Sequence, residues 1–340
     1  MADPTKLIAY VTNANDNGVS LKVGSVIPVD LGTGTPLKPI RIFGRTMSDG
    51  SGTNAIIVTA DGKTAFVTNE FTNSPAGSVS RIDLASGKVR WSVTVGAEPV
   101  DIEFVPGTHE EWAWVANYKD QTITTLNLDK GEVGAIIKVP GLGPNTVAFT
   151  PDGKFCYVAN WQTDNPAGSS VTLIEVTENG ANGNVLPSIL VGLNPNWVTF
   201  TKDGTTAYVA NKGSSSLTPI DVATNTPGAA IALPGPPIQI ERSPDGSFAY
   251  IAIAGNDIDA VVRLDLATTP ATVGPTIHLV NKSQPHWIGF TPDGTCAYIV
   301  GNGNSTLTPI TVAGDVLGQP ITVATGVSAD ILDIAIVAAG

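Results

Sequence analysis

The stretch that decides the fold is DGTTAYVAN, Asp203 to Asn211, together with the strand-like run NPNWVTFT before it, Asn194 to Thr201. The chain repeats this unit seven times. Five copies keep the Asp-Gly pair and two looser copies keep only the aromatic strand. The central aromatic residues are Tyr10, Phe66, Trp114, Tyr157, Tyr208, Tyr250 and Tyr298, which lie 42 to 56 residues apart. A repeat of this length is typical of propellers and solenoids.

Each full repeat offers four short strands with turn signals between them. In the repeat that contains Asp203, NPNWVTFT is followed by TTAYVAN, SLTPIDVA and GAAIAL. The Asp203-Gly204 pair between the first two strands suits a tight hairpin. No segment of ten or more residues has a clean helical period, so we expect no helix.

The two ends of the chain complete one another. First strands are expected to begin near Thr53, Pro99, Pro144, Pro195, Pro237, Pro285 and Ala329. The last of them, ADILDIAIV, has no second strand after it, and the N-terminal KLIAYVTN has no first strand before it. If Ile331–Val337 pairs with Leu7–Asn13, the sheets close into a ring without open edges. The sequence therefore predicts an all-β, seven-bladed β-propeller with four antiparallel strands per blade, forming one domain over residues 1–340.

The composition excludes several classes of partner. The chain has 340 residues, 42% of them apolar and 14% charged, and a net charge of −12. An acidic protein without a Lys/Arg cluster is a poor electrostatic partner for nucleic acid or an anionic membrane. No apolar run approaches the 18 or so residues of a membrane span.

The N-terminus and the cysteines say little about the compartment. MADPTKLIAY lacks the charged and apolar regions of a signal peptide, so we expect a cytoplasmic protein or a mature secreted form with a new start Met. Cys156 and Cys296 lie three repeats apart, too far around a ring to pair. Both are expected to be buried free thiols.

The repeats resemble a known family. YVTN, VTN and VAN followed by a small polar loop, the segment Ile220–Thr226 (IDVATNT), and first strands ending in F-T-P-D-G are similar to the YVTN β-propeller family over essentially the whole chain. Similar repeats serve surface-layer proteins, lactonase-like enzymes, virginiamycin-type lyases and electron-transfer domains, so the resemblance implies a fold rather than an activity. It also implies a pocket at the mouth of the central channel.

Strand order places the loops after the fourth and second strands on one face, the top face, where variable loops are expected to bind ligands. The seven repeats can be aligned with one another, and departures from their consensus at these positions are candidates. The expected ligand-binding residues are Tyr118, Trp161, Trp197, Trp287, Asp101, Gln239, Glu70, Lys212 and Asp330. The aromatic members could stack on a sugar or a planar ligand. Packing between blades is the alternative.

His286 is the candidate general base. It follows Pro285 at an expected channel-lining position, and a neutral imidazole can accept a proton near pH 7. Pro-His segments at strand starts also occur in virginiamycin-type lyases, which repeat the His in several blades, whereas here it occurs once. A structural histidine bonded to loop backbone is the alternative.

The fifth repeat is unusual because Arg242 stands where other repeats have Phe149, Phe200 or Phe290, with Glu241 beside it. An unpaired buried charge is strongly destabilising, so Arg242 needs a partner such as Glu103, Asp101, Asp330 or Asp333. The residues Glu241 and Arg242 form either an ion pair between blades or, with His286, a catalytic site.

No cofactor is expected, and support for a metal is thin. Asn13–Gly18 resembles the opening of a calcium loop but has one carboxylate, and Gly24 stands where such a loop needs Glu. Asn256, Asp257 and Asp259 could hold a hard cation. Nucleophile, phosphate-loop and haem motifs are absent from the sequence.

Two functions remain open. The first is a propeller that binds a small molecule, glycan or protein on its top face. The alternative is an enzyme of lyase or lactonase type, with His286 as the base and Arg242 or a cation stabilising an oxyanion. Binding of single-stranded nucleic acid lacks the positive groove that it requires.

Overall fold

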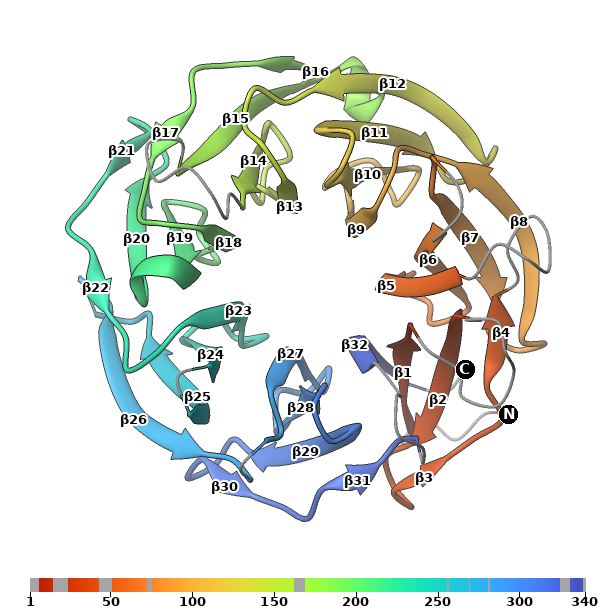
Figure 1. Cartoon of the computed structure of the whole chain (residues 1–340), viewed down its shortest axis with the longest axis vertical. Helices are drawn as coiled ribbons and strands as arrows, with labels where there is room; N and C mark the ends of the chain where they lie inside the picture. Colours follow the sequence, from red (N-terminus) through yellow and green to blue (C-terminus); the bar gives the residue numbers. More distant parts are fainter. Residues whose placement is uncertain are drawn as a thin grey trace. The chain divides into compact units, whose positions relative to one another are not determined.

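The computed structural model describes residues 6–14, 24–42, 51–71, 75–161, 169–255, 257–268, 270–280, 282–324 and 331–338. Within them it contains β-strands and two 3-10 turns, η2 (Glu178–Gly180) and η3 (Lys212–Ser214), and no α-helix. The strands form seven antiparallel sheets, the blades of a seven-bladed β-propeller, which confirms the predicted fold class (Figure 1). The chain divides into two compact units: unit 1 is Met1–Pro99 with Val280–Gly340, and unit 2 is Val100–Leu279.

Unit 1 contains three sheets. The strands of the first are β1 (Leu7–Asn13), β2 (Gly24–Asp30), β3 (Thr35–Pro36), β4 (Ile40–Ile42) and β32 (Ile331–Ala338). Those of the second are β5 (Ser51–Val58), β6 (Thr64–Phe71), β7 (Ser78–Asp83) and β8 (Lys88–Thr94). Those of the third are β27 (Pro285–Phe290), β28 (Cys296–Gly301), β29 (Thr306–Thr311), β30 (Val316–Leu317) and β31 (Ile321–Thr322).

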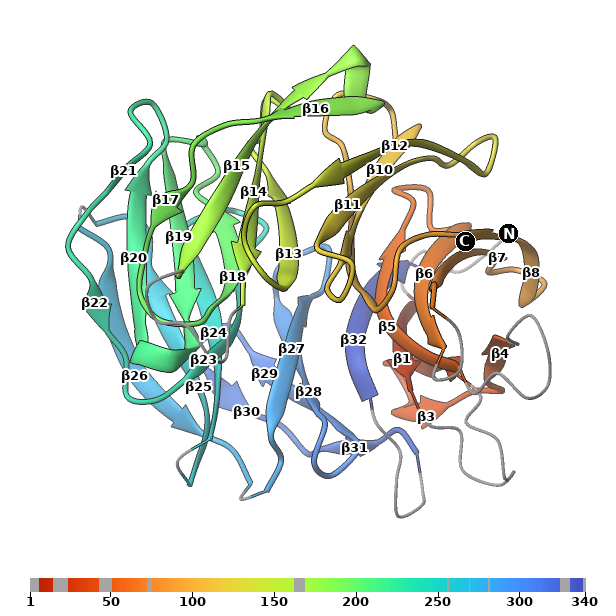
Figure 2. The same cartoon turned by 45° about the horizontal axis from the view of Figure 1, so that its top comes forward.

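The two ends of the chain meet in one sheet of unit 1. β32 pairs antiparallel with β1, so the C-terminal strand supplies the first strand of the blade that the N-terminus begins (Figures 1 and 2). Val11 lies opposite Ile334 and Asn13 opposite Ile331. The predicted pairing of the chain ends is confirmed.

The predicted start of this last strand was wrong by two residues. Asn13 pairs with Ile331 as Asn160 pairs with Pro144, so Ile331 holds the proline position that the sequence assigned to Ala329. Asp333 therefore occupies the position of Asp101. A shift of two residues keeps every side chain on the same face of the sheet, so the apolar alternation could not reveal the error.

Unit 2 contains four sheets. The strands of the first two are β9 (Pro99–Phe104), β10 (Trp112–Asn117), β11 (Thr122–Asn127) and β12 (Glu132–Lys138), then β13 (Pro144–Phe149), β14 (Phe155–Asn160), β15 (Ser170–Thr177), β16 (Asn182–Val185) and β17 (Ile189–Leu190). Those of the other two are β18 (Pro195–Phe200), β19 (Thr206–Asn211), β20 (Ser216–Asp221), β21 (Thr226–Pro227) and β22 (Ile231–Ala232), then β23 (Pro237–Arg242), β24 (Phe248–Gly255), β25 (Ile258–Asp265) and β26 (Thr272–His278).

The fourth strand is less regular than the sequence predicted. In four blades it consists of two short segments: β3 and β4, β16 and β17, β21 and β22, and β30 and β31. A proline lies in or between the segments of each pair, at Pro36, Pro187, Pro227 and Pro320. Proline lacks the N–H that a ladder needs, and it is tolerated here because the fourth strand is an edge strand.

The Asn that recurs near the end of most second strands has a structural cause. The Asn211 amide donates to Ser216 Oγ at 3.3 Å and to Thr218 Oγ1 at 2.9 Å, both on the next strand. The Asn160 amide likewise donates to the hydroxyls of Ser170 and Thr172. In four blades such buried amides, those of Asn69, Asn117, Asn160 and Asn211, join the second and third strands, which explains why VAN and VTN recur.

A glycine in the preceding loop packs against this amide, and substituting it should destabilise the fold. A Cβ on Gly141 would lie 2.3 Å from Asn160 Cγ, and the bonded Asn160 cannot move away cheaply. We expect Gly141→Ala to lower the free energy of unfolding by about 1–3 kcal/mol, as overpacking does. Urea unfolding measures it. Gly32→Ala is the control, since its Cβ would meet only Asp30 Oδ1, at 3.4 Å. Equal stability of the two variants would contradict this account.

The Asp-Gly turns after the first strands are fixed by a second repeated contact. Asp203 Oδ1 accepts from Thr201 Oγ1 at 2.6 Å and from the Thr205 N–H at 3.1 Å, and Gly204 takes a φ of +70°. These hydrogen bonds lower the pKa of Asp203. Geometry therefore accounts for the recurring Asp-Gly.

Several predictions about individual side chains can now be assessed. Trp114 is fully buried, and Trp91 packs on Phe66 with ring centroids 5.8 Å apart, so both are packing residues as expected. Both cysteines are free, but only Cys156 is buried, and Cys296 is partly exposed. None of the described helical turns is long and apolar enough to cross a membrane.

Candidate functional site

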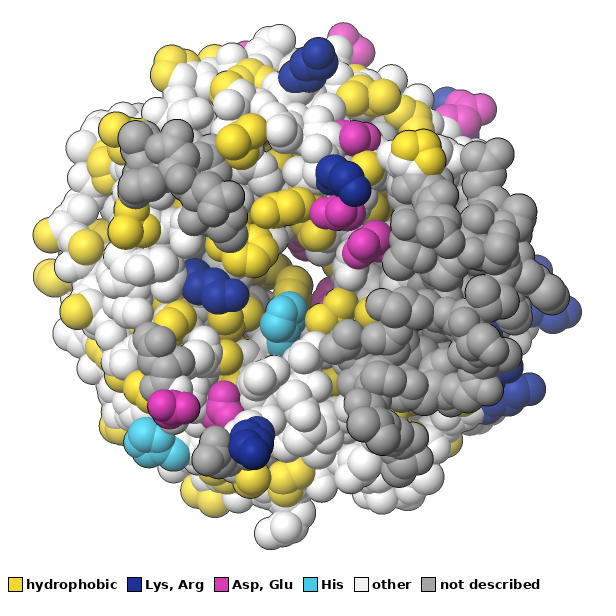
Figure 3. All heavy atoms as spheres, viewed as in Figure 1, with side chains coloured by type: hydrophobic (Ala, Val, Ile, Leu, Met, Phe, Trp, Pro, Cys, Tyr) yellow, Lys and Arg dark blue, Asp and Glu magenta, His cyan; other side chains and the backbone are white. Residues whose placement is uncertain are grey.

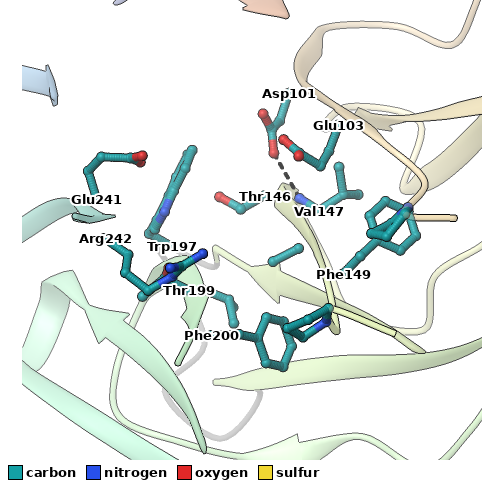
Figure 4. A pocket seen from close by; sticks show the side chains of 14 residues that line it. Asp101, Glu103, Thr146, Val147, Phe149, Trp197, Thr199, Phe200, Glu241 and Arg242 are labelled. Atoms are coloured by element: carbon teal, nitrogen blue, oxygen red, sulfur yellow. Dashed lines mark hydrogen bonds between the residues drawn. The ribbon is translucent and has the colours of Figure 1, made fainter. Parts of the chain in front are cut away.

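A pocket of about 300 Å³ lies within unit 2, along the first strands of its four sheets (Figure 4). These strands are β9, β13, β18 and β23, so each blade of the unit contributes to the wall. The lining residues that the argument uses are Asp101, Glu103, Thr146, Trp197, Thr199, Glu241 and Arg242. Pro106 and Pro151 extend the pocket toward the turns that follow the first strands, away from the top loops on which the sequence placed the site.

Asp101 is the buried carboxyl of the pocket. Its side chain is 5% exposed, and Oδ2 accepts from the Val147 N–H of the next sheet at 2.8 Å. Burial raises the pKa of Asp101 to about 7, although hydrogen bonds from the N–H groups of Val147 and Ile102 favour the ionised form. Asp101 thus makes a structural contact between two sheets and has a pKa near neutral pH.

Glu241 is the second carboxyl with a raised proton affinity. Its Oε2 accepts from Gln239 Nε2 at 3.2 Å, and burial raises its pKa to about 8 while the neighbouring Arg242 acts in the opposite direction. The side chain retains partial exposure and lines the pocket. A carboxyl with a pKa near the working pH can take up and release protons during catalysis.

Arg242 occupies the position that phenylalanine holds in other blades. It pairs with Ala249 as Phe200 pairs with Ala207, which confirms the alignment made from the sequence. Among the described residues no ion pair or hydrogen bond to its guanidinium is found; Glu241 is its neighbouring charge. Because Arg242 is only half-buried and faces the pocket, its charge stays partly solvated and needs no dedicated counter-ion.

Trp197 stands between the two carboxyl groups. In Figure 4, Glu241 extends along one side of the indole, while Thr146 and Asp101 lie beyond the other. Arg242 lies below, beside Thr199. The pocket therefore has an aromatic wall, two protonatable carboxyl groups and a cation.

Tyr118, Trp161 and Lys212 form a different group in unit 2. The rings of Tyr118 and Trp161 have centroids 6.0 Å apart, and Lys212 Nζ lies 5.0 Å from the Trp161 ring centroid. None of the three lines the pocket described above. Trp197, which the sequence grouped with Tyr118 and Trp161, lines that pocket instead.

His286 lies in unit 1 and contacts the neighbouring sheet. Its Nδ1 is 3.2 Å from the Leu332 carbonyl oxygen, and its ring stacks on Trp287 with centroids 5.3 Å apart. Asn145 makes the same kind of contact in unit 2, donating to the Asn196 carbonyl at 2.9 Å. Since a carbonyl only accepts, Nδ1 is the donor. The contact joins the two sheets and makes Nε2 the acceptor nitrogen of the His286 ring.

The other candidates are less informative. Glu70 ends the regular part of β6 in unit 1 and is half-buried. Asp330, Asn256 and most of the loop that resembles a calcium site (residues 15–18) lie outside the described residues. Within the described part of the chain, no group of three or more His, Cys, Asp or Glu residues could hold a metal ion.

The sequence drew attention to Asp101, Trp197, Glu241 and Arg242, and the structure brings these four together. It missed Thr199, and it named Glu103 only as a partner for Arg242. The missed signal was the alternation of the first strands, because residues two apart face the same side. Glu103 and Thr199 share faces with Asp101 and Trp197 for this reason.

The chain has been compared with known proteins. No protein-family model and no curated protein matches it. The periplasmic gluconolactonase PpgL of Pseudomonas aeruginosa superposes with a TM-score of 0.72 at 17% identity, covering 98% of this chain and 99% of that chain. A Bacteroides fragilis protein described as a candidate 6-phosphogluconolactonase gives 0.74 at 18% identity, with 98% of each chain covered. A Lactobacillus plantarum protein gives 0.75 at 14%, covering 98% and 99%. These likenesses show the fold alone.

Proposed function

We propose that this protein hydrolyses the lactone of a polyhydroxylated acid in the pocket of unit 2, with Glu241, Arg242 and Trp197 acting on the substrate. One observation carries the proposal. The carboxyl of Glu241, whose pKa is raised to about 8, lines the same pocket as the half-buried Arg242 guanidinium. A proton acceptor beside a fixed cation is what the addition of water to an ester carbonyl needs.

The size and lining of the pocket suit a sugar-derived ring. A volume of about 300 Å³ accommodates a small lactone. The indole of Trp197 offers a flat face for the C–H side of such a ring, and Thr146 and Thr199 offer hydroxyls for its polar side. The lactonase names among the structural neighbours are consistent with this class of substrate.

The reaction requires only groups that line the pocket. The ionised Glu241 takes a proton from a water molecule while the water oxygen bonds to the lactone carbonyl carbon. The carbonyl oxygen becomes an oxyanion, which Arg242 stabilises. When the intermediate collapses, the bond from carbon to the ring oxygen breaks and Glu241 returns the proton to that oxygen. The product is an open-chain hydroxy acid.

We infer as well that the chain is a YVTN-repeat propeller with a small-molecule substrate and no resident cofactor. The seven repeats and the Asn amides that join second and third strands support the family assignment.

A panel of stable five- and six-membered sugar lactones tests the proposal. Proton release is followed with a pH indicator, and the spontaneous rate without protein is subtracted. We expect at least one polyhydroxylated lactone to open faster with protein, and simple aliphatic lactones to respond less because they lack the hydroxyls. Tight binding of a sugar lactone without faster ring opening would replace the proposal with a purely ligand-binding propeller.

A further inference from the structure

Three neighbouring blades of unit 2 place equivalent residues at the same end of their second strands. Tyr118 follows Asn117 of β10, Trp161 follows Asn160 of β14 and Lys212 follows Asn211 of β19 (Figure 1). Since the three strands are equivalent, the three side chains emerge on the same side of their sheets. The short distances between Tyr118 and Trp161 and between Trp161 and Lys212 follow from this repetition.

The two rings are held in place by backbone. The Trp161 N–H donates to the Gly143 carbonyl at 2.8 Å. Gly143 has a φ of +64°, and a Cβ there would lie 2.4 Å from Trp161 O and 2.6 Å from Tyr118 Cε2. The loop before β13 therefore fits closely against both aromatic residues. A rigid aromatic surface of this kind loses little conformational freedom when a ligand binds.

Lys212 brings a cation to this surface without a matching acid. Its backbone N–H donates to the Asn194 carbonyl at 3.0 Å, which fixes the start of its side chain. Burial lowers the pKa of the half-buried Lys212 ammonium, and within the described chain no acidic side chain forms an ion pair with it. Burial disfavours the charged form of Lys212, and an anion bound beside its ammonium and the Trp161 ring would favour that form.

We propose that Tyr118, Trp161 and Lys212 form a second ligand site, which binds a uronate residue of an anionic oligosaccharide. The carboxylate of the sugar would contact Lys212, and the C–H faces of the ring would pack on the aromatic side chains. Leu142 and Leu193, which are 48% and 41% exposed, stand at equivalent places two residues before Pro144 and Pro195.

The geometry favours this class over two others. A neutral sugar would leave the Lys212 ammonium without a counter-charge. A flat aromatic acid binds best between parallel rings, but Tyr118 and Trp161 are inclined at 52° to each other. A sugar ring presents C–H groups in several directions and can contact two inclined faces at once. The site is independent of lactone hydrolysis, because none of its three residues lines the pocket.

Calorimetric titration with a galacturonate trimer, and with the matched neutral galactose trimer, tests the proposal. We expect the anionic trimer to bind at least tenfold more tightly than the neutral one, and its affinity to fall as salt is raised. Lys212→Gln should weaken binding about tenfold, which corresponds to about 1.4 kcal/mol. Trp161→Phe should remove most of the change in tryptophan fluorescence on binding. Lys138→Gln, an exposed lysine on β12, is the matched control and should bind as the unchanged protein does.

Each alternative result overturns the proposal. No binding of the galacturonate trimer, equal binding of the neutral trimer, or full affinity in Lys212→Gln would remove the site. Tighter binding of benzoate than of galacturonate would change the ligand class to aromatic acids. Glu241→Gln should bind the trimer normally, so failure of the lactonase proposal and failure of this one can be told apart.

Discussion

Glu241→Gln is expected to lower kcat/KM for lactone hydrolysis by about 10²- to 10⁴-fold, the usual contribution of a general base. The amide has nearly the shape of the carboxyl, and its oxygen can still accept from Gln239 Nε2, so the pocket should stay intact. What is lost is the ability to take a proton from water. Initial rates with the best lactone of the panel, measured for both proteins at one pH, give the ratio.

The pH dependence of the unchanged protein provides a second readout of Glu241. Burial raises its pKa to about 8, so at neutral pH most of the population carries the proton and cannot act as a base. We expect kcat/KM to rise with pH and to level off above about 8. Glu132→Gln, an exposed carboxyl on β12, should keep both the rate and the profile. A Glu241→Gln variant that retained full activity would place the chemistry elsewhere.

The fold could be predicted from this sequence because its seven repeats can be aligned with one another. Seven copies of one unit reveal which positions are constant, and the constant residues prove to be structural. Asn211 joins two strands and Asp203 closes a turn, so their repetition reports geometry rather than chemistry. The pairing of the chain ends followed from the same alignment, since Leu7–Asn13 lacked a first strand and ADILDIAIV lacked a second.

The alternation of apolar and polar residues shows which face of a strand is buried, but it does not determine the register of the strand. Ala329 and Ile331 are both acceptable as the start of β32, because a shift of two residues exposes the same face. The register of β32 is fixed by contacts with residues that are distant in the sequence. Asp333 Oδ2 accepts from the Ile56 N–H at 2.8 Å, as Asp101 accepts from Val147. A sequence of one chain does not show which neighbouring backbone an aspartate reaches.

The site was predicted in part, for a related reason. Arg242 was identified because it breaks the consensus of an apolar position, which one sequence with internal repeats can show, and Glu241 was named because it lies beside Arg242. The site was sought among the top loops, whereas the pocket runs along the first strands of unit 2 toward Pro106 and Pro151. His286 was selected for its chemistry, its expected channel-lining position and its Pro-His segment, and its contact with the Leu332 carbonyl resembles that of Asn145.

The second large effect that we expect is a change in stability with pH, caused by the buried carboxyl of Asp101. Its pKa is 3.8 in the unfolded chain and about 7 in the folded protein, because burial disfavours the ionised form. Between these values the native state binds the additional proton. The contribution of Asp101 to the free energy of unfolding should therefore fall as pH rises from about 4 to 7, by about 1.4 kcal/mol per pH unit at the steepest, or about 4 kcal/mol from this one group.

Asp152 and Asp245 make the protein less stable in acid, which is the opposite dependence on pH. Hydrogen bonds in their turns, with Lys154 in the case of Asp152, lower their pKa values to about 2, so the stability they provide is lost as pH falls below about 4. The protein should thus be most stable near pH 4 and lose stability on either side. Urea unfolding across this range measures the curve.

Asp101→Asn separates the contribution of Asp101 from that of Glu241, whose pKa of about 8 lowers stability over an overlapping pH range. The amide oxygen can still accept from the Val147 N–H, but the side chain no longer ionises, so the fall in stability between pH 4 and 7 should become less steep while the share due to Glu241 and the loss of stability in acid remain. At pH 8 the variant should be more stable than the unchanged protein, which is an unusual result for a buried substitution. Asp129→Asn, at an exposed turn, should leave the curve as it is. If Asp101→Asn kept the full fall in stability between pH 4 and 7, the carboxylate of Asp101 would have to be ionised in the folded protein at neutral pH, and its two backbone hydrogen bonds would outweigh the cost of burial.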